Sequence, residues 1–113
     1  MANTQQHLER YYENVEINVT TGTTNQVLST TSGVSFRTIL NPTTNSTENP
    51  SSVTIRTNNT ISIRLNKITA DAITITSTDS PYEISGITIT EVYITNNSGS
   101  TAAVRLFFQP TKY

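Results

Sequence analysis

The chain has 113 residues and no cysteine, and its seven Lys and Arg against eight Asp and Glu give a formal net charge of −1. This length fits one small domain with one core, the lack of cysteine excludes disulfides and thiolate metal sites, and a charge so near zero provides no overall field to attract nucleic acid or an anionic membrane. The 23 Thr, 12 Asn and 12 Ser would suit a disordered chain, but 12 Ile placed in alternation with Thr indicate strands, so we expect an all-β domain.

Residues 1–14 differ from the rest of the chain and include its single histidine, His7. They contain no apolar run of the kind that a signal peptide needs, so we expect synthesis in the cytoplasm. One set of residues has the helical spacing i, i+3, i+4, i+7: Leu8, Tyr11, Tyr12 and Val15. Another set lies at odd positions, as in an extended arm: Tyr11, Val15, Ile17 and Val19. We therefore predict either a short helix or an arm over 1–14, followed by a β-sandwich domain over 15–113.

The first strands are short and are separated by turn residues. We predict strands over 15–20, near 26–29 and over 34–40, the last with alternating apolar positions. The segment "NPTTNSTENPSS" at 41–52 has two Asn/Pro turn signals and almost no apolar residue, so it is predicted to be the longest loop.

The stretch "SVTIRTNNTISIRL" at 52–65 has all its large apolar residues at odd positions. If the two halves form a hairpin, facing residues share a side of the sheet, which pairs Ile55 with Ile61. This predicts a three-residue loop at 57–59 with Asn59 in the left-handed conformation, unless the two strands belong to different sheets.

The stretch "ITEVYITNNSGSTAAVRLFF" at 89–108 follows a further strand that begins at Ile73, and it has the same hairpin pattern. Matching parity pairs Ile94 with Ala102 and predicts a turn over 97–99 closed by a left-handed Gly99. The opposite face then carries Tyr93 and Phe107 together. This aromatic pair is interpreted as a second buried face of a sandwich or as a contact between subunits.

About eight short strands at roughly ten-residue spacing are typical of an antiparallel β-sandwich or jelly roll. No site for catalysis, a metal or a cofactor is predicted. His7 has no identifiable partner, and the acids Asp71, Asp79, Glu83 and Glu91 show no paired spacing. The sequence "DSPYE" at 79–83 lacks the pattern of a calcium loop and is interpreted as a turn.

The basic and aromatic side chains bear on two possible functions, nucleic-acid binding and carbohydrate binding. Arg56, Arg64 and Lys67 lie near one another in the sequence, but Ile residues separate them, so solvated outer faces are favoured over nucleic-acid binding. Carbohydrate binding stays open because exposed tyrosines often serve it, although the chain has no Trp. The available tyrosines are Tyr11, Tyr12, Tyr82, Tyr93 and Tyr113.

The segment "SPYEISGITITEVYITNNSGSTAAVRLFF" at 80–108 resembles the closing portion of small β-rich structural proteins of tailed bacteriophage virions. In those proteins a strand ending in "ITNNSGS" or similar often precedes an Ala- and Val-rich strand such as "TAAVRLFF". The resemblance brings no catalytic residues. It implies a structural subunit on the head, neck or tail of a virion, made in the host cytoplasm, with other virion proteins as partners.

The sequence thus favours a non-enzymatic subunit that forms a trimer or larger homo-oligomer. The predicted interface residues are Leu8, Tyr11, Tyr12, Tyr93 and Phe107. Two alternatives stay open: a module that recognises a surface glycan or receptor, and a bacterial surface or spore filament subunit whose arm completes the sheet of a neighbour. Neither nucleic acid nor a membrane is expected as a partner.

Overall fold

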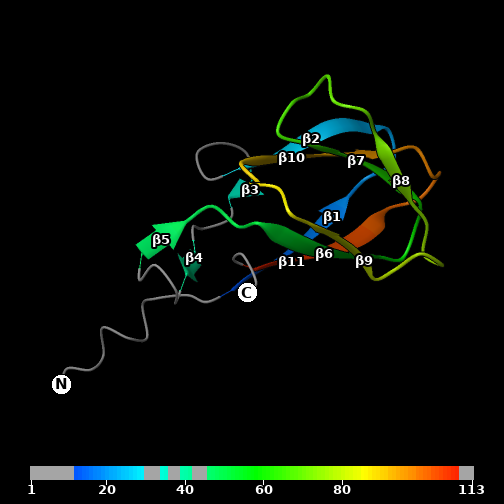
Figure 1. Ribbon diagram of the computed structural model, residues 1–113. Helices are drawn as coiled ribbons and strands as arrows, with labels where there is room; N and C mark the ends of the chain where they lie inside the picture. Colours follow the sequence, from blue (N-terminus) through cyan, green and yellow to red (C-terminus); the bar gives the residue numbers. More distant parts are fainter. Residues whose placement is uncertain (1–11, 30–33, 36–38, 42–45, 110–113) are drawn as a thin grey trace.

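The computed structural model describes residues 12–29, 34–35, 39–41 and 46–109 (Figure 1). Within these residues every regular element is a strand and none is a helix, which confirms the all-β prediction. Residues 1–11 fall outside the described part, so the choice between helix and arm stays a prediction. The strands are β1 (Glu13–Val19), β2 (Thr23–Ser29), β3 (Val34–Ser35), β4 (Ile39–Asn41), β5 (Ser46–Glu48), β6 (Ser52–Thr57), β7 (Ile61–Leu65), β8 (Ile73–Ile75), β9 (Tyr82–Ser85), β10 (Glu91–Asn96) and β11 (Ala102–Gln109).

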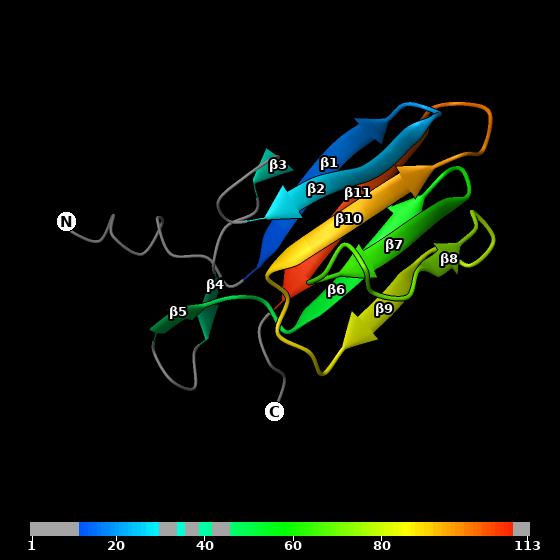
Figure 2. The same cartoon turned by 90° about the horizontal axis from the view of Figure 1, so that it is seen from above.

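Two sheets pack face to face, as Figures 1 and 2 show. Sheet A has the strand order β1-β11-β6-β9, and sheet B has the order β3-β2-β10-β7-β8. All the strand pairs in both sheets are antiparallel except the two-residue β3, which runs parallel to β2. The predicted β-sandwich is therefore confirmed.

The strand order is that of a jelly roll. Without the short β3, β4 and β5, eight strands remain, and the first pairs with the last (β1 with β11), the second with the seventh (β2 with β10), the third with the sixth (β6 with β9) and the fourth with the fifth (β7 with β8). These four pairs alternate between sheet A and sheet B. A long antiparallel ribbon wrapped into two sheets has this order.

The core lies between the sheets and is formed by the alternating apolar residues of both. Because successive side chains of a strand point to opposite faces, every second residue points inward. The buried apolar residues are Val15, Val19, Leu28, Val53, Ile55, Ile61, Ile63, Ile75, Ile89, Val92, Ile94, Ala102, Val104, Leu106 and Phe108. The parities that the sequence predicted for β6, β7, β10 and β11 are those observed.

Both expected hairpins are wrong in their pairing. β6 belongs to sheet A and β7 to sheet B, and likewise β10 belongs to sheet B and β11 to sheet A. Each connection is an arch that crosses from one sheet to the other, so Ile55 pairs with Leu106 and Tyr82 rather than with Ile61, and Ile94 pairs with Ile63 and Gln26 rather than with Ala102. Parity does not separate the two cases, because the facing strands of an arch also point their apolar residues into one core.

The turn conformations agree with the sequence in one case and differ in another. Gly99 has a φ of 95°, as predicted for the end of the 97–99 turn. Asn59 is not left-handed, whereas Asn25 (φ 53°) and Asn66 (φ 68°) are. Asn tolerates this conformation better than other residues with a Cβ.

The two ends of the sandwich differ, and we call them the terminal end and the arch end. At the terminal end, Glu13 at the start of β1 pairs with Phe108 near the end of β11, and the Ser51 amide donates to the Gln109 carbonyl (2.9 Å). The β4–β5 hairpin projects beyond this end in Figure 2. These two strands and β3 interrupt the segments predicted as one strand over 34–40 and one loop over 41–52.

Four arches lie at the opposite end: one at 76–81, and three neighbouring ones at 20–22, 58–60 and 97–101. Side chains tie these three together: Asn59 Nδ2 donates to the Thr101 carbonyl (2.8 Å), and the Gly99 amide donates to Thr21 Oγ1 (3.0 Å). The arch end is thus cross-linked by polar contacts, whereas the terminal end is where the chain enters and leaves the sandwich.

Candidate binding face

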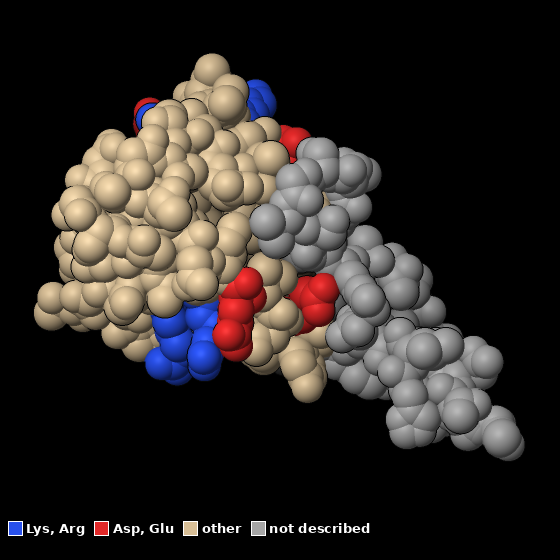
Figure 3. Space-filling view, turned by 180° about the vertical axis from the view of Figure 1, so that it is seen from behind, with Lys and Arg blue, Asp and Glu red and all other residues tan. Residues whose placement is uncertain are grey.

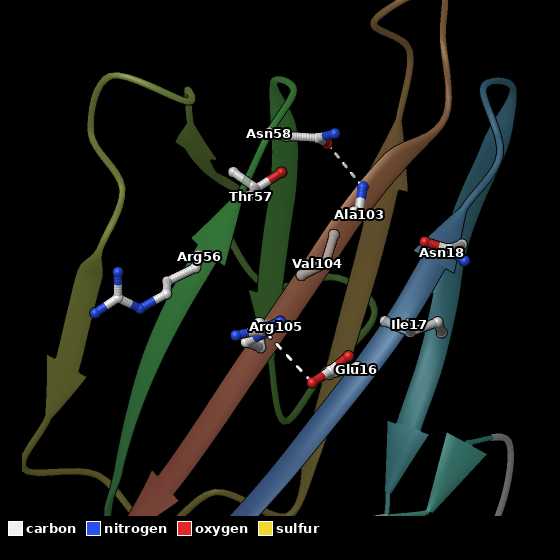
Figure 4. A pocket seen from close by; sticks show the side chains of 9 residues that line it. All are labelled: Glu16, Ile17, Asn18, Arg56, Thr57, Asn58, Ala103, Val104 and Arg105. Atoms are coloured by element: carbon white, nitrogen blue, oxygen red, sulfur yellow. Dashed lines mark hydrogen bonds and ion pairs between the residues drawn. The ribbon is translucent and has the colours of Figure 1, made fainter.

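The outer face of sheet A is hollowed over its β1, β11 and β6 strands. One hollow has a volume of about 480 Å³, and Figure 4 shows its lining, which includes Glu16, Asn18, Arg56, Asn58 and Arg105. Most of these side chains come from the outward-pointing positions of neighbouring strands, and Asn58 comes from the arch that follows β6. Their nearness in space follows from the register of strands that are far apart in the sequence.

Two arginines stand next to each other in the middle of this face. Arg105 on β11 is directly opposite Arg56 on β6 and directly opposite Glu16 on β1. Arg105 Nε lies 3.4 Å from Glu16 Oε2, but both side chains are more than half exposed, so this ion pair contributes at most about 1 kcal/mol. Arg56 is exposed and makes no ion pair with any residue that the structure describes. Figure 3 shows basic and acidic side chains gathered side by side at the lower edge of the molecule.

A second hollow of about 310 Å³ adjoins the first and shares Arg56 and Arg105 with it. Its other lining residues are Asn14, Thr54, Phe107 and Gln109. The ring of Phe107 packs against Tyr12, with ring centroids 5.3 Å apart and an angle of 31° between the planes. An aromatic pair, amide and hydroxyl groups and two guanidinium groups therefore share one open face. We call it the sheet A face.

The outer face of sheet B differs because its arginine is already engaged. Arg64 Nε donates to the Ala70 carbonyl (2.9 Å), and its Nη1 donates to Asn25 Oδ1 (3.1 Å). The segment between β7 and β8, which contains Ala70, rises above this sheet in Figure 1. Asn66 anchors the segment, because its Nδ2 donates to the Thr88 carbonyl and its Oδ1 accepts from the Thr90 amide, both at 2.8 Å.

The residues predicted as an oligomer interface do not form one surface. Tyr93 points outward from sheet B and Phe107 outward from sheet A, so the expected aromatic pair on a single face is wrong. The error follows from the hairpin assumption, because two strands of one sheet share an outer face and two strands joined by an arch do not. Tyr12 and Phe107 do lie together. Leu8 and Tyr11 lie outside the described residues, and the role of all five in assembly stays a prediction.

Tyr93 forms a hydrogen bond that makes the stability of the fold depend on pH. Its hydroxyl donates to Glu91 Oε1 (2.8 Å), and this bond, with smaller effects from desolvation and from the negative charge of Glu91, raises the pKa of Tyr93 above its ordinary value of 10.0. A raised pKa in the folded state means that the contribution to stability is complete below pH 10 and is lost as the pH rises through the folded pKa.

We expect Glu91→Gln to lower the pKa of Tyr93, since an amide neither repels the phenolate nor holds its proton as strongly as a carboxylate does. The measurement is an NMR titration of ¹³C-labelled tyrosine in the folded protein. Glu83→Gln, which removes an exposed carboxylate from sheet A, is the matched control and leaves the midpoint of Tyr93 unchanged. An unchanged midpoint in Glu91→Gln contradicts the assignment of Glu91 as the cause.

The other candidate residues are scattered over the fold. Asp79 Oδ2 accepts from the amide (3.1 Å) and hydroxyl (3.0 Å) of Thr76, which closes a turn over 76–79. The turn predicted at 79–83 is therefore misplaced, because Tyr82 and Glu83 belong to β9. Arg56 and Arg64 point from opposite sheets, so the basic residues that are near one another in the sequence do not form one patch. In the described part of the chain no group of three or more His, Cys, Asp or Glu is arranged to hold a metal ion. His7 falls outside it.

Comparison with family models, with curated proteins and with solved structures finds no match to this chain. Among the residues that the structure describes, no helix has the length and apolar character needed to cross a bilayer.

The sheet A face itself was missed by the sequence prediction. The alternating positions of Arg56 and Arg105 place both on polar sides of strands, but only the pairing of β6 with β11 brings these sides together.

Proposed function

We propose that this protein is a non-enzymatic structural subunit of a bacteriophage virion that works by self-assembly and by attachment to the particle. One observation carries the proposal: the strand order is that of a jelly roll, an architecture that recurs in viral capsid proteins. The fold alone does not decide function, since lectins also use it. The resemblance of residues 80–108 to phage structural proteins supports the virion over the other classes. The proposed location is accordingly a virion that is made in the host cytoplasm.

The asymmetry between the two ends supports attachment at the terminal end. At this end the chain enters β1 and leaves β11, and the β4–β5 hairpin projects beyond the sheets (Figures 1 and 2). The arch end has its polar groups engaged with one another. A subunit of this shape attaches through its terminal segments and hairpin and displays its arches.

Self-assembly to a trimer or larger is supported by the position of β1 at the edge of sheet A. β1 is seven residues long, and within the described residues it pairs only with β11. An unpaired edge strand offers its amides and carbonyls to another chain. A closed ring and a filament both use such an edge, so the form of the assembly separates the virion subunit from the filament alternative.

Removal of residues 1–11 is expected to abolish assembly and to leave the sandwich folded, because β1 begins only at Glu13 and the buried core starts at Val15. Mass photometry and light scattering measure the assembly state, and circular dichroism with thermal melting measures folding. A cut after residue 14 is unsuitable as a test because it removes the first two residues of β1.

The outcomes separate the alternatives. Loss of a closed oligomer in the truncated chain supports the proposal, and electron microscopy of the full chain distinguishes rings from fibres. A full-length protein that stays monomeric at high concentration, both alone and with purified virion components, overturns it. An oligomer that is unchanged by the truncation overturns the role given to the N-terminal segment.

A further inference from the structure

We propose that the sheet A face binds a carboxylate-bearing glycan. Arg56 and Arg105 hold the carboxylate, and the Tyr12/Phe107 pair packs against a sugar ring. This inference goes beyond the structural role proposed above and does not depend on where the protein resides or whether it assembles.

The first argument is the position of the two arginines. They are directly opposite one another on neighbouring strands, where side chains with like charges destabilise a sheet. Arg105 is partly compensated by Glu16 at its Nε, and no other bond of its guanidinium is found within the described residues. In Figure 4 the Arg105 side chain lies toward Glu16 and the Arg56 side chain extends to the other side, toward β9. The guanidinium of Arg56 and the two terminal nitrogens of Arg105 therefore border the hollows without a bond to any described residue, while the Nε of Arg105 keeps its ion pair with Glu16.

A carboxylate is the anion that suits these groups. The planar guanidinium presents two parallel donors that match the two oxygens of a carboxylate, and a negative charge beside both arginines removes their mutual repulsion. Glu16 and, on β9, Glu83 are the acids that face the same side. Their negative charges limit the affinity for a carboxylate and restrict its favourable position to the neighbourhood of Arg56 and Arg105.

The second argument is the neighbouring hollow. Its volume of about 310 Å³ is at the lower end of small-molecule sites, which begin near 300 Å³. Phe107 and the 56% exposed Tyr12 form an aromatic surface at this side, on which the C–H face of a sugar ring can pack. Asn14, Thr54 and Gln109 supply amide and hydroxyl groups that pair with sugar hydroxyls.

Other anionic partners fit this face less well. A nucleic acid gains its affinity from many phosphate contacts, and here two arginines stand beside two acids. An acidic peptide adds most readily as a strand along a sheet edge, whereas Arg56 and Arg105 lie on β6 and β11, which have neighbours on both sides. A carboxylate on a compact polar ring reaches the middle of the sheet without using an edge.

The test uses the full chain and a panel of uronate- and sialate-containing oligosaccharides, each with its carboxyl-reduced counterpart. At least one acidic member is expected to bind ten times more tightly than its reduced counterpart by isothermal titration calorimetry. Arg56→Gln and Arg105→Gln each weaken that binding about tenfold, and Phe107→Ala weakens both members of the pair. Lys67→Gln removes one exposed positive charge outside the face and is the matched control, which leaves binding unchanged.

Three results overturn the inference: no acidic member binds better than its reduced form, Lys67→Gln weakens binding as much as Arg56→Gln does, or a poly-glutamate peptide binds as tightly as the best glycan. Thermal melting verifies that each variant is folded, and Arg56→Lys, which keeps the charge but loses the planar fork, recovers only part of the affinity. Because binding is measured independently of oligomer size, failure of the assembly proposal and failure of this one are distinguishable.

Discussion

Replacing Phe108 by alanine is expected to lower the free energy of unfolding by about 3–5 kcal/mol. Phe108 is fully buried near the end of β11, where it pairs with Val53 of β6 and Glu13 of β1. The loss of an aromatic side chain removes its transfer free energy and leaves a cavity that closely packed strands fill only in part. Chemical denaturation measures the change, which is a large part of the 5–15 kcal/mol that stabilises an ordinary domain.

Phe107→Ala is the matched control, because it makes the same change one residue away on the opposite side of the strand. Phe107 is partly exposed and contacts Tyr12, and an aromatic pair of this kind contributes about 0.5–1.5 kcal/mol. We therefore expect a much smaller loss of stability. Equal losses for the two substitutions would contradict the assignment of β11 faces on which both the core and the sheet A face depend.

Asn96→Ala is expected to destabilise the fold by about 2–3 kcal/mol, the second-largest effect of a single substitution that we predict. Asn96 is completely buried at the arch end. Its Nδ2 donates to the Val19 carbonyl (2.7 Å) and the Ser100 carbonyl (2.9 Å), and its Oδ1 accepts from the Ser98 amide (2.9 Å). Alanine removes all three bonds, including the buried one to the Val19 carbonyl, and a buried polar group that loses its partner is costly.

Asn97→Ala provides the comparison at the next position. Asn97 is exposed, so its replacement is expected to change the free energy of unfolding by no more than about 0.5 kcal/mol. Hydrogen exchange adds a structural measurement, since loss of the Asn96 side chain is expected to speed the exchange of amides at 20–22 and 98–101. A stable Asn96→Ala variant with unchanged exchange would show that the arches are held by other contacts.

Asn96 also links two connections at the arch end to each other. Its carbonyl accepts from the Gly22 amide (2.7 Å), so this residue joins the β10–β11 arch to the β1–β2 turn through both backbone and side chain. Asn58 links the β6–β7 arch to β11, because its Oδ1 accepts from the Ala103 amide (2.8 Å). The many Asn residues of the chain thus include several that bond across arches far apart in the sequence.

The sheet A face and the arch end use polar residues in opposite ways. At the arch end, amides such as Asn59 and Asn96 bond to the protein itself. On the sheet A face, Arg56 has no ion pair with any described residue, and Arg105 has only the exposed one with Glu16. This difference makes the sheet A face, rather than the arches, the region where binding of a partner is proposed.

Alternation of apolar and polar residues was sufficient to predict the all-β class and the inward faces of the main strands, and the turn residues at 97–99 predicted the left-handed Gly99. Val92, Ile94, Val104 and Leu106 are buried as their parity requires, because the period of two in side-chain direction is a local property of a strand. The sequence alone also determined that the domain is a sandwich rather than a helical fold.

Only the tertiary structure decided which strands pair. A hairpin and an arch have the same sequence pattern, two alternating strands and a turn, and both direct their apolar residues to one side or one interior. The choice depends on partners far away in the chain: β10 pairs with β2 and β7, and β11 pairs with β1 and β6. These long-range pairings place Tyr93 and Phe107 on opposite faces and bring Arg56 beside Arg105, and hydrogen bonds between distant backbones leave no periodic trace in the sequence.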